Sequence, residues 1–180
     1  MKLARRLAAI GIACFALAAA PSSAEVMQSA PDGAHMVHQL RVEATPAAVY
    51  ALIGQVGRWW SGEHSYSGDA ANLTLAVEPG GCFCERWKDG AVEHARVIMV
   101  MRDQVVRLSG ALGPLQVKAV NGVLTFLLKP DGSGTQLTLG YRVTGSSLSG
   151  LDKDAPAVDG VLNVQVQRLK RLAETGKAAS

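Results

Sequence analysis

The chain has 180 residues, with 18 lysines and arginines against 15 aspartates and glutamates, and a formal net charge of +3. This excess lies at the N-terminus, because Lys2, Arg5 and Arg6 precede the first acidic residue, Glu25, and the rest is formally neutral. A neutral body excludes the basic surface that non-specific nucleic-acid binding requires. With 48% hydrophobic and 18% charged residues, the composition also excludes a disordered protein and predicts one compact domain.

Residues 1–24 have the pattern of a cleavable secretory signal. A basic start is followed by an apolar stretch of 14 residues, Leu7 to Ala20, and by small residues that end at Ala24. This stretch is shorter than the roughly 20 residues of a membrane-spanning helix. We therefore expect an exported protein, periplasmic or extracellular, with no stable membrane anchor after cleavage. The expected parts are a signal peptide (1–24), a flexible leader (25–34), one ligand-binding domain (35–176) and a tail (177–180).

Within the domain, an alternating strand over 35–43 comes first. Thr45-Pro46 signals the start of a helix, and a second short helical turn is expected over 56–60. From Leu73 to Thr144, alternation and turn residues predict a curved antiparallel sheet of about seven strands in total. Apolar residues spaced by three and four from Val158 to Leu172 predict a long C-terminal helix. Helices segregated from an antiparallel sheet define an α+β domain.

Several of these motifs resemble a known superfamily. The stretch Thr45–Ile53, the pair Trp59-Trp60, the run Glu78–Glu85 before Asp89-Gly90, and the long terminal helix look like the START-related, polyketide-cyclase-like superfamily. They are particularly similar to its branch of heat-shock-ATPase activators. The resemblance implies a helix-grip fold, in which a curved sheet closes partly round the terminal helix.

A space between sheet and helix that is lined by apolar residues is a small-molecule site. The expected function is therefore binding of a small hydrophobic or lipid-like molecule. Two alternatives stay open: an enzyme of cyclase or dehydratase type, and a protein-interaction module whose partner the sequence does not identify.

Candidate lining residues fall on the inward faces of the predicted elements. The strand from Ala91 to Arg102 is apolar on both faces, which indicates burial on both or a cavity wall on one. Ordinary core packing is the alternative for Trp59 and Met99. The candidates are Trp59, Phe83, Glu85, Trp87, Val97, Met99, Leu162, Val166 and Leu169.

Glu85 is the candidate catalytic acid or base. If Phe83, Glu85 and Trp87 share the inward face, desolvation raises the pKa of the Glu85 carboxyl and suits it to proton transfer. His64 or His94 is a candidate to assist.

Two other interpretations of Glu85 are structural. In the opposite register, Cys82 and Cys84 face inward and Glu85 faces solvent. An inward Glu85 that pairs with an arginine, such as Arg96 or Arg107, would stabilise the fold without catalysis.

Cys82 and Cys84 are the cysteines that remain after cleavage, in an oxidising setting. A disulfide between them closes a very small ring, so we expect two free thiols that pack as small apolar groups. A strained redox pair is the alternative. Thiolate and imidazole suit zinc, but Glu63-His64 and Glu93-His94 lie on separate elements and form no ligand motif. No metal and no cofactor are predicted.

Overall fold

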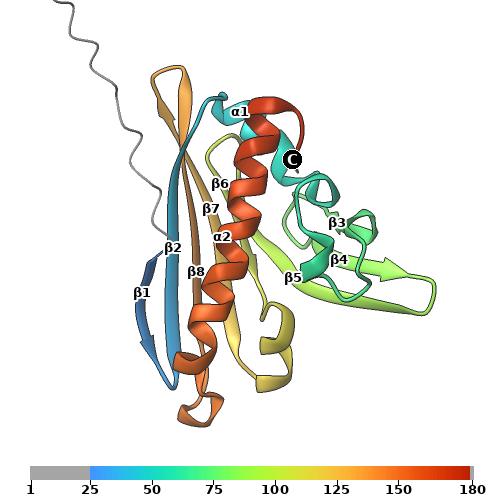
Figure 1. The fold of residues 1–180 in the computed structure, drawn as a ribbon, viewed down its shortest axis with the longest axis vertical. Coiled ribbons are helices and arrows are strands. Elements are labelled where there is room, and N and C mark those ends of the chain that lie inside the picture. Colours follow the sequence, from blue (N-terminus) through green and yellow to red (C-terminus); the bar gives the residue numbers. More distant parts are fainter. Residues whose placement is uncertain (1–24, 179–180) are drawn as a thin grey trace, which may run out of the picture.

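The computed structural model describes residues 25–178, so the expected signal peptide and residues 179–180 lie outside the described chain. An antiparallel sheet of eight strands curves along the long C-terminal helix α2 (Figure 1). This arrangement confirms the predicted α+β class and fits a helix-grip fold, with eight strands in place of about seven. The strands are β1 (Glu25–Ala30), β2 (Gly33–Val42), β3 (Leu73–Leu75), β4 (Cys82–Trp87), β5 (Gly90–Met101), β6 (Val105–Ser109), β7 (Asn121–Asp131) and β8 (Gly134–Thr144), and the α-helices are α1 (Pro46–Ile53) and α2 (Leu151–Thr175).

Strand β1 replaces most of the flexible leader that the sequence predicted over 25–34. It pairs antiparallel with β2 through a tight turn at 31–32. The prediction was wrong because it took the absence of an alternating apolar pattern in this segment as evidence against a strand. An edge strand gains its hydrogen bonds from the backbone of its neighbour, and these bonds need no particular side chains.

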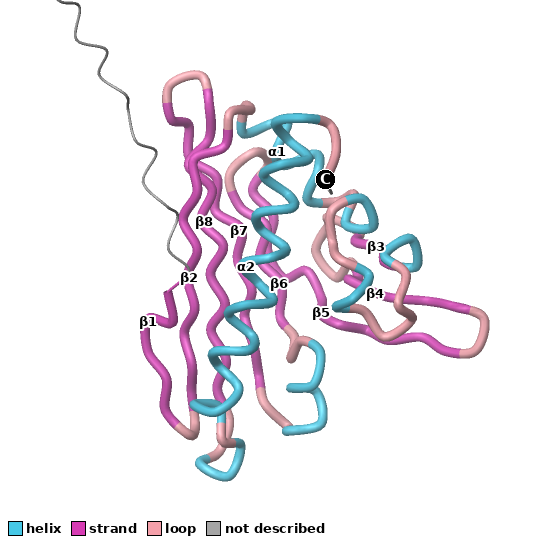
Figure 2. The backbone as a smooth tube through the Cα atoms, viewed as in Figure 1, coloured by secondary structure: helices cyan, strands magenta, loops and turns pink. Residues whose placement is uncertain are grey.

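The sheet has a regular part and an irregular part. Its strand order is β1-β2-β8-β7-β6-β5-β4-β3, and β2 pairs with β8, and β8 with β7, without a register shift. The ladders of β4 with β5 and of β5 with β6 each contain a bulge. Bulges bend and twist a strand, and the β4–β5 hairpin projects away from the long strands (Figure 2).

Helix α1 has a side-chain cap at its start, and α2 ends at a glycine cap. The Thr45 side chain accepts a hydrogen bond at the start of α1, and Pro46 occupies the first helical position, as the sequence predicts. Helix α2 begins at Leu151, several residues before the apolar pattern, and follows Gly150 at a φ of 62°. It ends at Gly176 with a φ of 77°. Its first turn escaped prediction because acidic residues favour a helix N-terminus without any apolar period.

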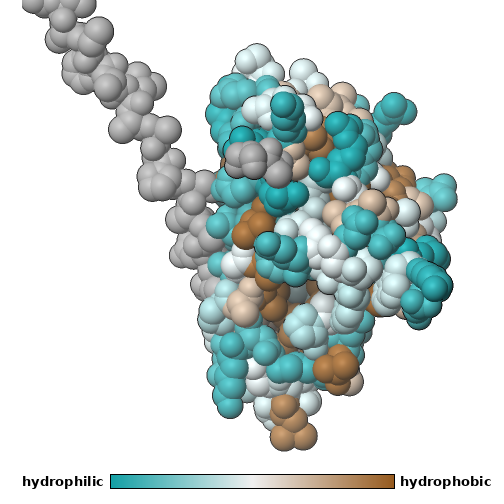
Figure 3. Space-filling view, turned by 45° about the vertical axis from the view of Figure 1, so that its right-hand side comes forward, coloured by the Kyte–Doolittle hydropathy of each residue, from teal (hydrophilic) through white to brown (hydrophobic). Residues whose placement is uncertain are grey.

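The apolar stripe of α2 packs on the sheet and forms the core. Leu162, Val166 and Leu169 are all buried there. The two most exposed large apolar side chains, Val117 and Leu148, come from separate elements. In Figure 3 the apolar residues form separate brown spots among hydrophilic ones. No helix among residues 25–178 is long and apolar enough to cross a membrane.

Candidate functional site

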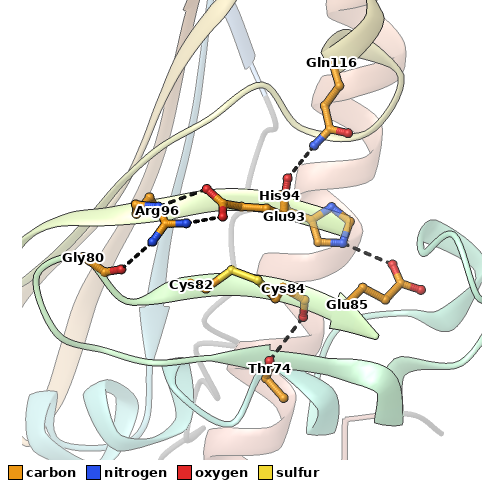
Figure 4. Close-up of a disulfide and its surroundings, with 9 residues drawn as sticks. All are labelled: Thr74, Gly80, Cys82, Cys84, Glu85, Glu93, His94, Arg96 and Gln116. Carbon is orange, nitrogen blue, oxygen red and sulfur yellow. Dashed lines mark hydrogen bonds and ion pairs between the residues drawn. A yellow bond between two sulfur atoms is a disulfide. The ribbon is translucent and has the colours of Figure 1, made fainter. Parts of the chain in front are cut away.

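A bulge in β5 brings His94 against Glu85. The register of β4 against β5 shifts between Phe83 and Cys84, which leaves His94 as the extra residue of β5. A bulge re-aims the side chain that it carries. The imidazole is buried, and its Nε2 lies 3.1 Å from Oε2 of Glu85 (Figure 4).

Glu85 is fully buried, which confirms the inward register of β4. Its Oε2 accepts the Tyr66 N–H at 3.0 Å and its Oε1 accepts the Ser67 N–H at 2.5 Å. Burial by itself raises the pKa of the Glu85 carboxyl, but the hydrogen bonds from Ser67, Tyr66 and His94 outweigh it and hold that pKa below its ordinary value. The expected rise in pKa was therefore wrong, and Glu85 is an ionised hydrogen-bond acceptor at neutral pH.

His94 is neutral at the same pH. Burial lowers the pKa of its imidazole, and the hydrogen bond and charge of Glu85 offset this only in part. An ionised carboxylate only accepts hydrogen bonds, so Nε2 of His94 carries the proton that binds Glu85. Nδ1 makes no hydrogen bond with the described residues and is not fully buried. The pair therefore presents an oriented imidazole with one free basic nitrogen.

Aromatic rings flank this imidazole. The His94 ring centroid lies 4.9 Å from that of Phe83 and 5.9 Å from that of Tyr66, which is stacked on it. Tyr66 is half exposed, and its hydroxyl donates to the carbonyl of Gly113. The segment that carries Tyr66 thus covers the pair from the solvent side.

Gln165 of α2 is a site residue that the sequence analysis missed. Its buried amide accepts the Ser61 N–H at 2.7 Å and lies 2.8 Å from Nδ1 of His64. His64 is therefore held to α2. Of the two histidines considered as assistants of Glu85, His94 contacts it and His64 does not. Glu85 and Gln165 fix the loop over 61–67 from two sides. The available signal was a polar residue inside the apolar stripe, directly before Val166.

Most candidate lining residues belong to a packed core. The centroids of Trp59 and Phe126 are 6.2 Å apart, and those of Trp60 and Phe83 are 5.3 Å apart. These rings pack in the core between sheet and α2. The apolar candidates at that place are therefore core residues and line neither of the two pockets described below. The buried candidates are Trp59, Phe83, Glu85, Val97, Leu162, Val166 and Leu169.

The other two candidates lie outside this core. A second bulge leaves Ile98 as an extra residue of β5, so Met99 pairs with Arg107 while Val100 packs on the core. Strict alternation would place Val97 and Met99 on one face, but the alternation shifts by one residue at the bulge and separates them. Trp87 is partly exposed at the end of the β4–β5 hairpin, with its ring against Gly90.

Cys82 and Cys84 form a disulfide, which corrects the expectation of two free thiols. Residues two apart on a strand face the same side, and the Cα atoms lie 5.4 Å apart, within the range of disulfides. Both sulfurs and a carboxylate oxygen of Glu93 lie within 4.8 Å of one another. In the disulfide state, the cysteines hold no thiolate for a metal ion. Figure 4 shows the bond on β4, between Thr74 on β3 and the ion pair of Arg96 with Glu93 on β5.

An open groove of about 580 Å³ lies beside this disulfide. Its walls are the segment 54–58, strand β3 with Ala76, and the side chains of Cys82 and Arg86. The segment approaches the neighbouring loop closely, because a Cβ at Gly57 would lie 2.8 Å from the carbonyl oxygen of Ala70. A second hollow of about 510 Å³ lies over β1, β2 and β8.

Two arginines give the groove an unbalanced positive charge. Arg58 and Arg86 are exposed, and neither contacts an acidic side chain of the described residues. Within the described part of the chain, the Arg58 guanidinium donates to the amide oxygen of Gln55 alone. By contrast, Arg41 and Arg96 both form ion pairs with carboxylates.

Comparison with known proteins supports the fold. No family model and no curated protein matches the sequence. Among solved structures, the conserved protein of unknown function EF2215 from Enterococcus faecalis has a TM-score of 0.57 at 14% identity, over 88% of this chain and 80% of that one. The Aha1 dimer from Colwellia psychrerythraea has a TM-score of 0.51 at 16% identity, over 79% and 98%.

A third similar structure is DynU16, a putative protein of the dynemicin biosynthetic locus. Its TM-score is 0.56 at 17% identity, and the match covers 80% of this chain but 48% of that chain. At such identities, likeness shows a shared fold and specifies no reaction. The chain therefore has a fold that is also found in an Aha1 protein and in a protein of a natural-product locus.

Proposed function

We propose that this chain is an exported protein that binds a small hydrophobic molecule carrying an anionic group, in the groove beside β3 and β4. The observation that carries the proposal is the pair of unpaired arginines, Arg58 and Arg86, at a groove of about 580 Å³. This volume lies in the range of sites for small molecules, roughly 300–1,000 Å³. Fatty-acid-like carboxylates match both the apolar walls and the charge.

The arginines argue for an anion because both border the groove and neither contacts an acidic side chain of the described residues. A guanidinium binds a carboxylate with two parallel hydrogen bonds, and such charge-assisted bonds are about twice as strong as neutral ones. The basic and apolar pattern of residues 1–24 supports export. The motifs around Trp59-Trp60 and Glu78–Glu85 support membership of the branch of heat-shock-ATPase activators. Export and membership of that branch belong to the same proposal as ligand binding.

The test compares dodecanoate with dodecanol in binding titrations of the exported form. We expect dodecanoate to bind more tightly, and the double variant R58Q/R86Q to lose about tenfold or more of that affinity, since each lost charged hydrogen bond is worth about 1.5–3 kcal/mol. Arg102→Gln removes an equal charge at an exposed site outside the groove and serves as the control. Equal affinities for acid and alcohol, or an equal loss in Arg102→Gln, would contradict the proposal.

A second candidate function is acid–base catalysis of the cyclase or dehydratase type. The contact of 3.1 Å between Glu85 and His94 favours it. In this proposal Glu85 positions the imidazole, and Nδ1 of His94 takes the proton from a carbon next to a carbonyl group. A base with a pKa near the working pH is the most effective, and histidine meets that requirement better than a fully hydrogen-bonded carboxylate.

Diacetone alcohol is a suitable probe, because its dehydration product absorbs in the ultraviolet. We expect His94→Gln to reduce turnover by about 100-fold or more, as is typical for loss of a general base. His64→Gln is the matched control, because His64 contacts Gln165 and not Glu85. Turnover that is absent in the wild type, or unchanged in His94→Gln, would reject this second function.

A further inference from the structure

The Cys82–Cys84 disulfide lacks the usual role of a structural crosslink. It joins two residues of one strand and encloses a single residue, so it connects no separate elements. In the chain-entropy account, a crosslink stabilises a fold by restricting the unfolded chain, and the restriction shrinks with the enclosed loop. The strand is already paired on both sides, with β3 and with β5. The fold therefore gains little from this bond.

The two sulfurs have unequal surroundings. Cys82 is partly exposed and forms part of the groove wall, whereas Cys84 is 4% exposed. Arg96 is the partner of Cys82 across the β4–β5 ladder, but Glu93 neutralises its charge, so the two sulfurs differ in exposure. An incoming thiol thus reaches Cys82 first, and Cys84 lies behind it as the second member of the pair.

We propose that Cys82 and Cys84 form a redox-active pair that exchanges with a small dithiol in the groove. One thiolate of the dithiol attacks Sγ of Cys82, the bond between Cys82 and Cys84 breaks, and the electron pair leaves on Sγ of Cys84, which takes a proton from solvent. The second thiolate of the dithiol then attacks the first sulfur of the same dithiol, which is bonded to Cys82 in the mixed disulfide. This step closes the dithiol's own disulfide and releases Cys82 as a thiolate, which takes a proton from solvent. The dithiol is oxidised to a disulfide, and the protein disulfide is reduced to two thiols.

This activity goes beyond the proposed binding function and does not need the anionic ligand. It uses a different chemical group, the disulfide, and a different partner, a dithiol. It agrees with the proposed export, because oxidising compartments preserve disulfides. Loss of dodecanoate binding in R58Q/R86Q and loss of thiol exchange in cysteine variants are therefore independent outcomes.

The first experiment measures reduction of the native protein by dithiothreitol without denaturant. We expect each mole of protein to consume one mole of dithiothreitol and to gain two alkylatable thiols, which peptide mapping assigns to Cys82 and Cys84. Circular dichroism should be unchanged after reduction. A bond that resists dithiothreitol until the protein is denatured would overturn the proposal.

The second experiment tests which of the two cysteines an outside reagent reaches. In the exported form without residues 1–24, and hence without Cys14, each single variant leaves one thiol, and oxidised glutathione is the probe for mixed-disulfide formation. We expect Cys84→Ser, which leaves Cys82, to react at least about tenfold faster than Cys82→Ser, because reactivity follows exposure and thiolate character. C82S/C84S with a native circular dichroism spectrum and no reaction is the control for the fold. Equal rates in the two single variants would overturn the assignment of Cys82.

Discussion

Among residues 25–178, two buried histidine–carboxylate pairs lie in parts of the sheet that differ in regularity. His38 of β2 faces Asp159 of α2 in the regular part, with 3.1 Å between Nε2 and Oδ1. His94 faces Glu85 at the same distance in the bulged part. Neither ring nitrogen of His38 nor Oδ1 of Asp159 makes a well-directed hydrogen bond, whereas Glu85 accepts several. A histidine–carboxylate pair is therefore held by apolar packing in the regular part and by hydrogen bonds from a loop in the bulged part.

The difference shows where this fold places its reactive groups. Along β2, β8 and β7, unbroken ladders keep strict alternation, so their inward side chains form the core with α2. In β5, each bulge shifts the alternation and redirects a side chain. The imidazole of His94, the disulfide and the groove all lie at this irregular end. Regular pairing provides stability, and irregular pairing provides the exposed or oriented chemical groups.

The largest expected effect tests the packing of the regular part. Leu169→Ala should lower the free energy of unfolding by about 3–4 kcal/mol, because Leu169 is fully buried on α2 and its truncation leaves a cavity. Met99→Ala is the matched control, since the bulge at Ile98 turns Met99 away from the core, and we expect a loss below about 1 kcal/mol. Chemical denaturation measures both. Similar losses would show that Met99 packs in the core after all.

A smaller effect should separate the two carboxylates. Glu85→Gln places an amide against backbone N–H groups and should lower the free energy of unfolding by about 2–3 kcal/mol, as expected for lost charged hydrogen bonds. Asp159→Asn should cost less than about 1 kcal/mol, because Oδ1 of Asp159 accepts no well-directed hydrogen bond. Guanidinium titrations of both variants measure this difference. Equal losses in the two variants would mean that the hydrogen bonds from the loop over 61–67 to Glu85 add nothing to the stability of the fold.

The sequence predicted the regular part better than the irregular part. Thr45-Pro46 marked the start of α1, and the apolar stripe with Leu162 and Val166 marked α2, because periodicity and capping act over a few neighbouring residues. These features depend on local order that a single sequence displays. Alternation along β4, by contrast, left two registers open, and the burial of Glu85 selects the inward one.

The bulges and the disulfide did not follow from the sequence. A bulge is one extra residue in a ladder, and nothing in the local pattern distinguishes His94 or Ile98 from its neighbours. The contact of Glu85 with His94 depends on that shift, and so does the outward position of Met99. The groove likewise combines 54–58 with β3 and β4, which are distant in the chain.

The smallest expected effect is the dependence of stability on pH, to which the two paired histidines, His38 and His94, contribute. Burial lowers the pKa of His38 and of His94 below 6.5, and the paired carboxylates offset this only in part. The unfolded chain therefore binds more protons below about pH 6.5, so the stability of the fold should decrease as the pH falls through that value and stop decreasing below the folded-state pKa values. Glu85 acts in a lower window: its pKa is held below 4.5, so its contribution is lost only in stronger acid.

Urea titrations between about pH 8 and pH 5 test this assignment. His38→Gln and His94→Gln should each flatten the dependence of stability on pH, since each removes a group that must be protonated at a cost in the folded state. Glu85→Gln should steepen it, because His94 loses the carboxylate that favours its charged form. His64→Gln, whose imidazole contacts only a neutral amide, controls for loss of a ring. If neither His38→Gln nor His94→Gln changes the slope, the two buried pairs do not set the acid sensitivity of this fold.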